Sequence, residues 1–134
     1  MADPEIALVK RLSAAGSVVE VGVGNRPTVA AAVAERGVDV TATDIHERSV
    51  PDPVSFVRDD VTQPTLSVYE GADIVFARNL PPELQRPVRT LARRVDAACW
   101  FTTLGGDPAV VPAEAEQLPG GVVLYRTVDG PGQR

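Results

Sequence analysis

The chain has 134 residues, enough for one domain with a single core. Its net charge is −5, and its basic residues are twelve Arg and one Lys, so it lacks the basic balance that free nucleic acid requires. No apolar run is long enough to span a bilayer, and the acidic start at Met1–Glu5 does not resemble a secretory signal. We therefore expect one cytoplasmic domain over residues 1–134, with no membrane contact.

Strands and helices are predicted to alternate along the chain. A first helix begins at Asp3–Pro4 and ends before Gly16. Six short, mostly β-branched strands follow, at residues 18–21, 38–43, 54–57, 73–77, 98–104 and 122–128. Because most are apolar on both faces, they are typical of a parallel sheet covered by helices on each side.

The segments between these strands predict the helices. Residues 28–36 form one helix, which Gly37 ends. Another long helix begins near Pro87 and runs to residue 95, with residues 81–85 as a looser lead-in. A short helix covers residues 113–118. The alternation predicts a Rossmann-like, doubly wound α/β fold with a mostly parallel sheet of about six strands. The expected core order is 3-2-1-4-5, with the place of the last strand open.

The most informative stretch is Val18–Pro27, a strand that ends in a glycine-rich turn and runs into a helix. Gly22 allows a sharp turn, and Gly24 leaves room for a ligand near the backbone. The free N–H groups of the following helix favour an anionic group. Asp44 lies twenty residues after Gly24. The strand, the glycine turn, the helix start and this later acid together form the skeleton of a nucleotide-binding half-site. The alternative is a tight turn without a ligand.

Two residues indicate which cofactor such a site would take. The dinucleotide fingerprint requires a small residue where this chain has Pro27. Glu20 places a carboxylate on a strand that is otherwise buried. A pyrophosphate would gain no attraction from this carboxylate, whereas an ammonium group would. This disfavours NAD and favours S-adenosylmethionine. The alternative for Glu20 is pairing with an Arg or with backbone N–H groups.

Acids also end the second and third strands. Asp44 could accept both hydroxyls of a ribose, and Asp60, together with Val61, could face an adenine. Asp44 could instead be a turn residue or a helix cap, and Asp60 could simply be solvated beside Asp59.

These residues carry a resemblance to a known family. Glu20–Gly24 resembles the first motif of class I S-adenosylmethionine-dependent methyltransferases, acid-x-Gly-x-Gly-x-Gly, although Arg26 replaces the last glycine. Asp44 and Asp60 match the acids that meet ribose and adenine in that family. The resemblance covers residues 16–104 and implies the fold and S-adenosylmethionine as the cofactor.

More narrowly, the whole chain is similar to an archaeal family of short, uncharacterised Rossmann-like proteins. The shared features are Glu20–Pro27, Val40–Asp44 and Arg78–Leu84. This narrower resemblance implies no reaction.

The segment after the fourth strand is the candidate substrate region. Amino-methylating enzymes have Asn-Pro-Pro and an aromatic residue there, whereas here Leu80 separates Asn79 from Pro81–Pro82, and Glu83 replaces the aromatic. Arg78, Asn79 and Glu83 remain candidate substrate contacts, since they follow a strand at the ligand-binding end of the sheet. The alternative is a rigid turn with a salt-bridged Arg.

No residue is assigned to catalysis. His46 has no Cys or second His nearby for a metal site, so we expect none, and it is either an exposed loop residue or a general base. Cys99 lies in an apolar run and is expected in the core. Gly105–Asp107 could border the same cleft as the substrate region.

We therefore expect a minimal methyltransferase-like domain that binds S-adenosylmethionine and transfers a methyl group to an unidentified acceptor. A small molecule or a protein fits the acidic balance better than free nucleic acid. The first alternative is a non-catalytic module that senses the cofactor, or a subunit that a protein partner or a second copy completes. The second is an NAD-type nucleotide binder.

Overall fold

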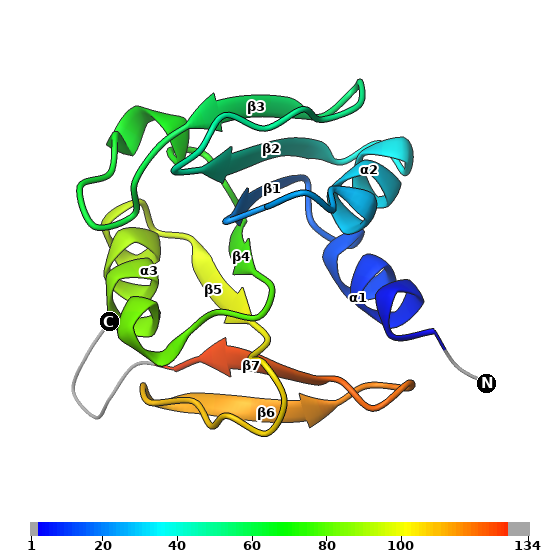
Figure 1. The fold of residues 1–134 in the computed structure, drawn as a ribbon, viewed down its shortest axis with the longest axis vertical. Helices are drawn as coiled ribbons and strands as arrows, with labels where there is room; N and C mark the ends of the chain where they lie inside the picture. Colours follow the sequence, from blue (N-terminus) through cyan, green and yellow to red (C-terminus); the bar gives the residue numbers. More distant parts are fainter. Residues whose placement is uncertain (1–2, 129–134) are drawn as a thin grey trace.

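A computed structural model describes residues 3–128 and shows a twisted seven-stranded sheet with helices against both faces (Figure 1). The elements, in chain order, are α1 Pro4–Leu12, β1 Ser17–Val21, α2 Thr28–Glu35, β2 Asp39–Asp44, β3 Ser55–Arg58, the 3₁₀ turn η1 Leu66–Val68, β4 Ile74–Ala77, α3 Pro82–Arg94, β5 Ala98–Phe101, β6 Ala113–Gln117 and β7 Val123–Thr127.

The sheet order is β3-β2-β1-β4-β5-β7-β6. The first five strands are parallel, whereas β7 runs antiparallel to both β5 and β6. The predicted core order 3-2-1-4-5 is therefore confirmed, and the last predicted strand takes its place beyond β5. Ligands of such sheets bind where the winding reverses, at the carboxyl ends of the central strands.

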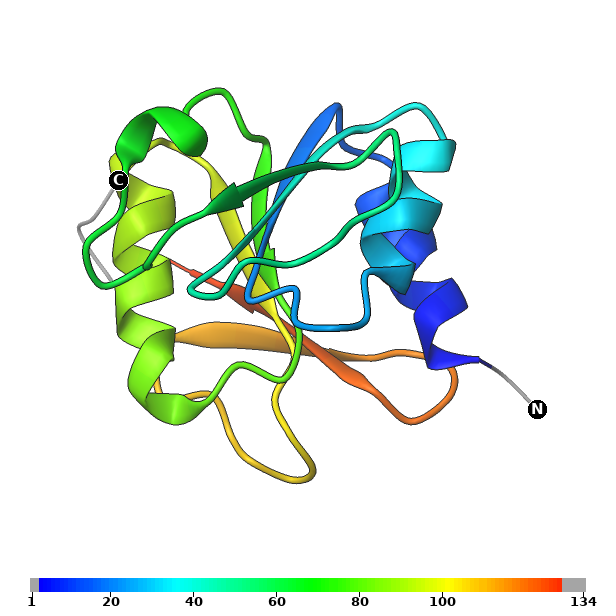
Figure 2. The same ribbon diagram turned by 45° about the horizontal axis from the view of Figure 1, so that its top comes forward.

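The helices form two layers. Figure 2 shows α1 and α2 on one side of the sheet and α3 on the other. Alternate residues of β1 serve these two layers. Val18 packs in the core under α1 and α2, and Val19 and Val21 pack in the core under α3. Because both faces of β1 are covered, a polar side chain on it is held away from water.

The predicted helix at residues 113–118 is wrong, because these residues form β6. Ala, Glu and Gln favour a helix in isolation. Here Ala113 to Gln117 pair residue by residue with β7, and Leu118 is buried in the core. The sheet therefore has seven strands instead of about six. Backbone pairing with a distant strand has overridden local preference.

The predicted start of the second long helix near Pro87 is also wrong, because α3 begins at Pro82 and is regular through Pro87. Pro82 suits a first helical turn, since its missing N–H would have no partner there. Gln85 is fully buried and holds the first turns in place. Its Nε2 donates to Pro108 O at 3.3 Å, and its Oε1 accepts from Val110 N at 2.6 Å.

The other elements agree with the sequence to within a few residues. Asp3 caps α1 by accepting a 2.9 Å hydrogen bond from Glu5 N, and α1 ends at Leu12. Cys99 is 3% exposed, and burial raises the pKa of its thiol to about 12, which confirms a core residue. Within residues 3–128, no helix combines the length and the apolar character needed to cross a bilayer.

Candidate functional site

The glycine turn after β1 is bonded directly to the end of β2. Gly22 N and Val23 N both donate to Thr43 O, at 2.8 and 3.1 Å, and Gly24 N donates to Asp44 Oδ2 at 2.9 Å. Gly22 and Gly24 have φ angles of +68° and +64°, a region that strains any residue with a Cβ. A Cβ at Gly22 would meet nothing within 4 Å, so the requirement there is for the backbone angle and not for space.

Asp44 is the buried centre of this turn. It is 7% exposed, and its Oδ1 accepts a second 2.9 Å hydrogen bond, from His46 N. Burial raises the pKa of Asp44, but the N–H groups of His46 and Gly24 and the charge of Arg48 outweigh it, so this pKa lies below its ordinary value. Asp44 is therefore a structured carboxylate, unlike an exposed turn residue. Its role as a ribose ligand stays a prediction.

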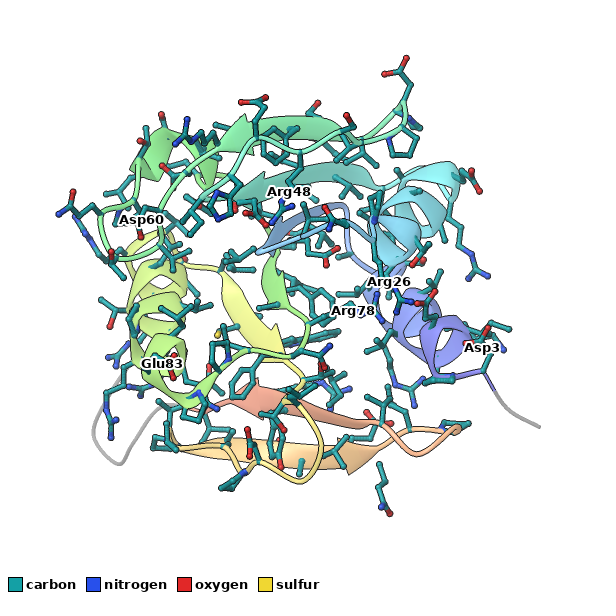
Figure 3. The ribbon with its side chains drawn as sticks, in the orientation of Figure 1. Asp3, Arg26, Arg48, Asp60, Arg78 and Glu83 are labelled. Carbon is teal, nitrogen blue, oxygen red and sulfur yellow. The ribbon has the colours of Figure 1, made fainter. Side chains whose placement is uncertain are left out.

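Arg48 lies across this edge of the sheet (Figure 3). Its Nη1 donates to Asn25 Oδ1 in the glycine turn at 2.7 Å, and its Nε lies 3.4 Å from Asp44 Oδ1. The Nε is buried and makes no hydrogen bond of good geometry. The guanidinium thus lies directly beside the Asp44 carboxylate.

Glu20 is a carboxylate in the core, two residues before the turn. It is 3% exposed and lies on the face covered by α1 and α2, in register with Ala42 and Phe76. Burial raises its pKa to about 8, although the charge of Arg78 lowers it, and Glu5 raises it further. Burial therefore favours the protonated form of Glu20, and a cationic ligand would favour its charged form.

A pocket of about 430 Å³ opens along the carboxyl ends of β4 and β5. The start of α1, the segments after these two strands and the turn between β6 and β7 line it. Arg78, Asn79 and Asp107 contribute polar groups, and Tyr125 contributes an aromatic ring. The predicted contacts Arg78 and Asn79 therefore meet in one pocket with the Gly105–Asp107 loop.

The segment after β4 is anchored to the end of β5. Asn79 has a φ of +52°, and its N–H donates to the hydroxyl of the buried Thr102 at 2.9 Å. Arg78 turns toward α1, where its Nη2 donates to Glu5 Oε2 at 3.2 Å. Arg78 is thus both a salt-bridged turn residue and a wall of the pocket, and its charge also acts on Glu20.

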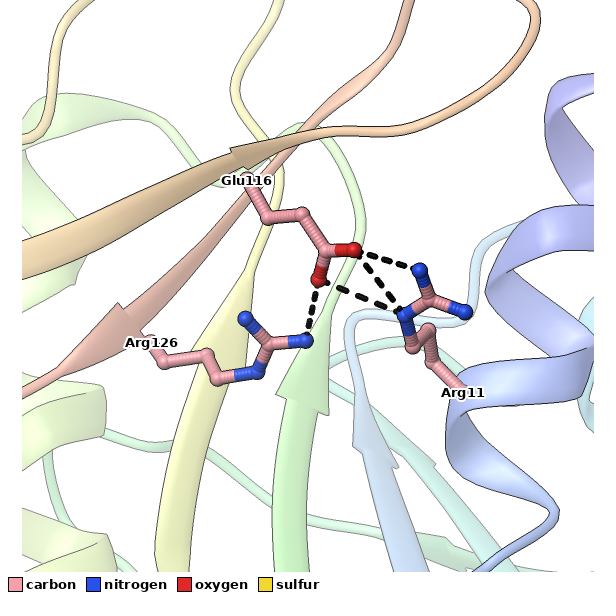
Figure 4. Close-up of polar contacts among 3 residues, drawn as sticks. All are labelled: Arg11, Glu116 and Arg126. Atoms are coloured by element: carbon pink, nitrogen blue, oxygen red, sulfur yellow. Dashed lines mark hydrogen bonds and ion pairs between the residues drawn. The ribbon is translucent and has the colours of Figure 1, made fainter.

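The β6–β7 hairpin forms one side of the pocket and is attached to α1. At Gly120, where φ is +94°, a Cβ would lie 2.7 Å from Pro4 N. Figure 4 shows the other attachment, in which Glu116 accepts hydrogen bonds from both Arg11 on α1 and Arg126 on β7. These two side chains hold the pKa of Glu116 at about 2.

The end of β3 forms a separate part of the edge. Asp60 is exposed and accepts hydrogen bonds from the hydroxyl and the N–H of Thr62, at 2.7 and 2.9 Å, which lower its pKa. Asp59 accepts a 2.7 Å hydrogen bond from the buried Tyr69 hydroxyl. Val61 is 8% exposed and packs in the core under α3. Asp60 is therefore the more accessible of the two acids, and its contact with adenine stays a prediction.

Two residues singled out in the sequence lie apart from the pocket. Glu83 is exposed on the first turn of α3, whereas Arg78 lies toward α1 (Figure 3), and Glu83 does not line the pocket. His46 is an exposed loop residue whose backbone N–H donates a hydrogen bond to Asp44. Pro27 is the N-cap residue of α2.

The sequence did not point to Arg48, Glu5 or Thr102. Each joins two chain segments that are distant in sequence, so no local pattern marks it. The only available signal was the position of Arg48, four residues after the strand-ending Asp44.

Residues 2–126 match the model of an uncharacterised protein family, UPF0146. The chain belongs to this family. A UPF0146 protein of the archaeon Halobacterium salinarum is 55% identical to it over 122 residues, which cover 91% of this chain and 93% of that protein. The predicted resemblance to a short archaeal family is confirmed.

The fold of this UPF0146 chain is similar to those of methyltransferases. An RNA methyltransferase from Salinibacter ruber, solved in complex with S-adenosyl-L-homocysteine, aligns with a TM-score of 0.63 and 15% identity, over 99% of this chain and 98% of that one. A Zn-dependent alcohol dehydrogenase from Rhodobacter sphaeroides aligns with a TM-score of 0.53 and 15% identity, over 81% and 57%. At such identities the likeness shows the fold alone.

Proposed function

We propose that this UPF0146 protein binds S-adenosylmethionine across the carboxyl ends of β1, β2 and β3. The observation that carries the proposal is Glu20, a carboxylate with a pKa of about 8 in the core beside the glycine turn. An ionised carboxylate is costly to bury without a compensating charge, so burial favours the protonated form of Glu20. The ammonium group of the methionine part would supply that charge, whereas the pyrophosphate of NAD would add like charge.

Asp44 supports the ribose part of the proposal. Its two oxygens have about four lone-pair sites, and the N–H groups of Gly24 and His46 take two of them. The remaining sites can accept the two ribose hydroxyls when the Arg48 guanidinium moves aside. Asp60, at the end of β3, remains accessible to the adenine amine.

The pocket beyond β4 and β5 suits a methyl acceptor. Its volume of about 430 Å³ would take a small molecule or one side chain of a protein. Its charged groups are Glu5, Asp107 and Arg78, a balance that favours a neutral or cationic acceptor over a polyanion. Since the sulfonium is already activated, positioning of the acceptor by Asn79 and Arg78 would supply most of the rate.

Calorimetric titration with S-adenosylmethionine, S-adenosylhomocysteine and NAD tests the cofactor. We expect the first two to bind in the micromolar range and NAD to bind far more weakly. The absence of heat with the first two at millimolar concentration, or equal affinity for NAD, would exclude the proposal.

Transfer is tested separately, because a cofactor-sensing module or a partner-dependent subunit would also bind. The protein is incubated with methyl-labelled S-adenosylmethionine and with the small-molecule and protein fractions of a cell extract. We expect label in one of the two fractions. Tight binding without a labelled product in either fraction would favour the non-catalytic module.

A further inference from the structure

Helix α3 is basic on an acidic chain. It carries four arginines and one glutamate, which gives a local charge of +3, whereas the whole chain has a net charge of −5. The proposed cofactor site and the pocket use none of these arginines. The helix buries its apolar face in the core and exposes the basic one.

A groove of about 360 Å³ runs between α3 and the segment after β3. Apolar residues of both segments line its floor and walls, among them Val61, Pro64, Pro87 and Leu91. Arg86 and Arg94 line the same groove. They are eight residues apart, which is roughly 12 Å along a helix. The groove therefore combines an apolar lining with two guanidinium groups carried by the same helix.

Arg86 and Arg94 are exposed, and neither donates a hydrogen bond or forms an ion pair with any other residue between 3 and 128. Arg89 of the same helix, in contrast, donates to Val128 O at 3.5 Å. The described residues that line the groove include no acid. Both guanidinium groups thus remain available to a ligand.

We propose that this groove binds an acidic segment of a protein partner, which places an apolar side chain on the floor and a carboxylate at each guanidinium. Arg is the side chain best suited to bind carboxylates at protein interfaces. In an extended segment, carboxylates four residues apart are separated by about 13 Å, which matches the spacing of the two arginines. A nucleic acid fits less well, because the groove lacks the aromatic rings on which bases stack.

A labelled nonapeptide with two Glu four residues apart and a Leu midway between them is the direct probe. Fluorescence anisotropy should show binding to the intact chain. The double substitution Arg86→Gln with Arg94→Gln should weaken it by roughly tenfold or more. The matched double substitution Lys10→Gln with Arg36→Gln removes two exposed charges from the other helical layer and should leave it unchanged.

Further probes separate the contributions of the ligand. Replacement of both Glu by Gln, or of Leu by Ala, in the peptide should weaken its binding to the protein. A rise from 0.1 to 1 M salt should reduce the affinity of the original peptide without abolishing it. The melting temperatures of both double variants are expected to match that of the intact chain, because all four side chains are exposed.

Three results would overturn the proposal. The first is no peptide binding at millimolar concentration, or equal loss in the matched control. The second is a single-stranded oligoribonucleotide that binds more tightly than the peptide and depends on Arg86 and Arg94, which would make the ligand a nucleic acid. The third is self-association in sedimentation that the same double variant abolishes, which would make the occupant a second copy. None of these depends on whether S-adenosylmethionine binds.

Discussion

The two halves of the sheet's carboxyl edge differ in how far the chain itself occupies them. Above β1 and β2, Asp44 accepts from Gly24 and His46, and Arg48 bridges Asp44 and Asn25. Above β4 and β5, a pocket stays open between α1 and the β6–β7 hairpin. The first half therefore has its candidate cofactor-binding groups held in place by contacts within the chain, whereas the second half offers a cavity.

This difference would separate the two tasks of the proposed site, which are cofactor binding and acceptor binding. A cofactor at the first half would have to exchange one internal contact for its own, which makes its binding sensitive to single side chains. An acceptor at the second half would meet a cavity whose shape depends on how the hairpin is fastened to α1. Substitutions in the two halves should therefore fail in different ways.

The largest effect is expected from Glu20→Gln, measured as stability against pH. The pKa of Glu20 is about 8 in the folded chain and about 4.5 in the unfolded one. The unfolded chain thus loses its proton first as pH rises, so stability falls between about pH 4.5 and 8. Urea unfolding at pH 5, 7 and 9 should show a loss of about 4 kcal/mol from pH 5 to pH 9 in the intact chain.

The Gln variant should be nearly independent of pH over that range, because its amide does not titrate. Asp39→Asn, at the exposed start of β2, is the control and should keep the slope of the intact chain. A Gln variant with the same slope would show that another group carries the dependence.

Asp44→Ala should damage both stability and cofactor binding. It leaves the N–H groups of Gly24 and His46 without an acceptor, which should lower the free energy of unfolding by about 3 kcal/mol. Loss of the proposed ribose hydrogen bonds should weaken the binding of S-adenosylmethionine by roughly 100-fold, as measured by calorimetry. Asp39→Ala is the control, and unchanged binding in Asp44→Ala would contradict the ribose assignment.

Gly120→Ala tests the contact between the β6–β7 hairpin and α1, beside the pocket. The new methyl group would lie 2.7 Å from Pro4 N at a φ of +94°, so the hairpin would have to move away from α1. We expect a loss of about 3 kcal/mol in urea unfolding. Gly121→Ala has a similar φ of +89° but meets nothing within 4 Å, so it should lose only about 1 kcal/mol. Equal losses would mean that the contact with Pro4 is unimportant.

Arg48→Gln should have the smallest effect. Removal of the guanidinium frees Asp44 for a ligand, so S-adenosylmethionine should bind a few times more tightly, by roughly 1 kcal/mol. Arg58→Gln, which loses a hydrogen bond to Ile45 O, is the control for loss of a charge at this edge. Weaker binding in Arg48→Gln would mean that the guanidinium contacts the cofactor instead of competing with it.

The sequence predicted the positions of Gly22, Gly24 and Asp44 because each lies at the end of a buried strand or just after it. Parallel strands bring their carboxyl ends to one edge, so position in the chain was enough to place Gly22, Gly24 and Asp44 together. Glu83 shows the limit of this reasoning. It follows the same strand as Arg78, but α3 carries it away from the pocket, toward the other side of the sheet.

The chain by itself determined the parallel order β3-β2-β1-β4-β5, the glycine turn and the buried acid two residues before it, because periodicity, strand length and turn chemistry are local properties. Only the tertiary structure decided that residues 113–117 form a strand, that α3 begins at Pro82 and that Arg48 lies against Asp44. Each of these depends on a partner distant in sequence, and the energy of such a contact can exceed the local preference of the residues that make it.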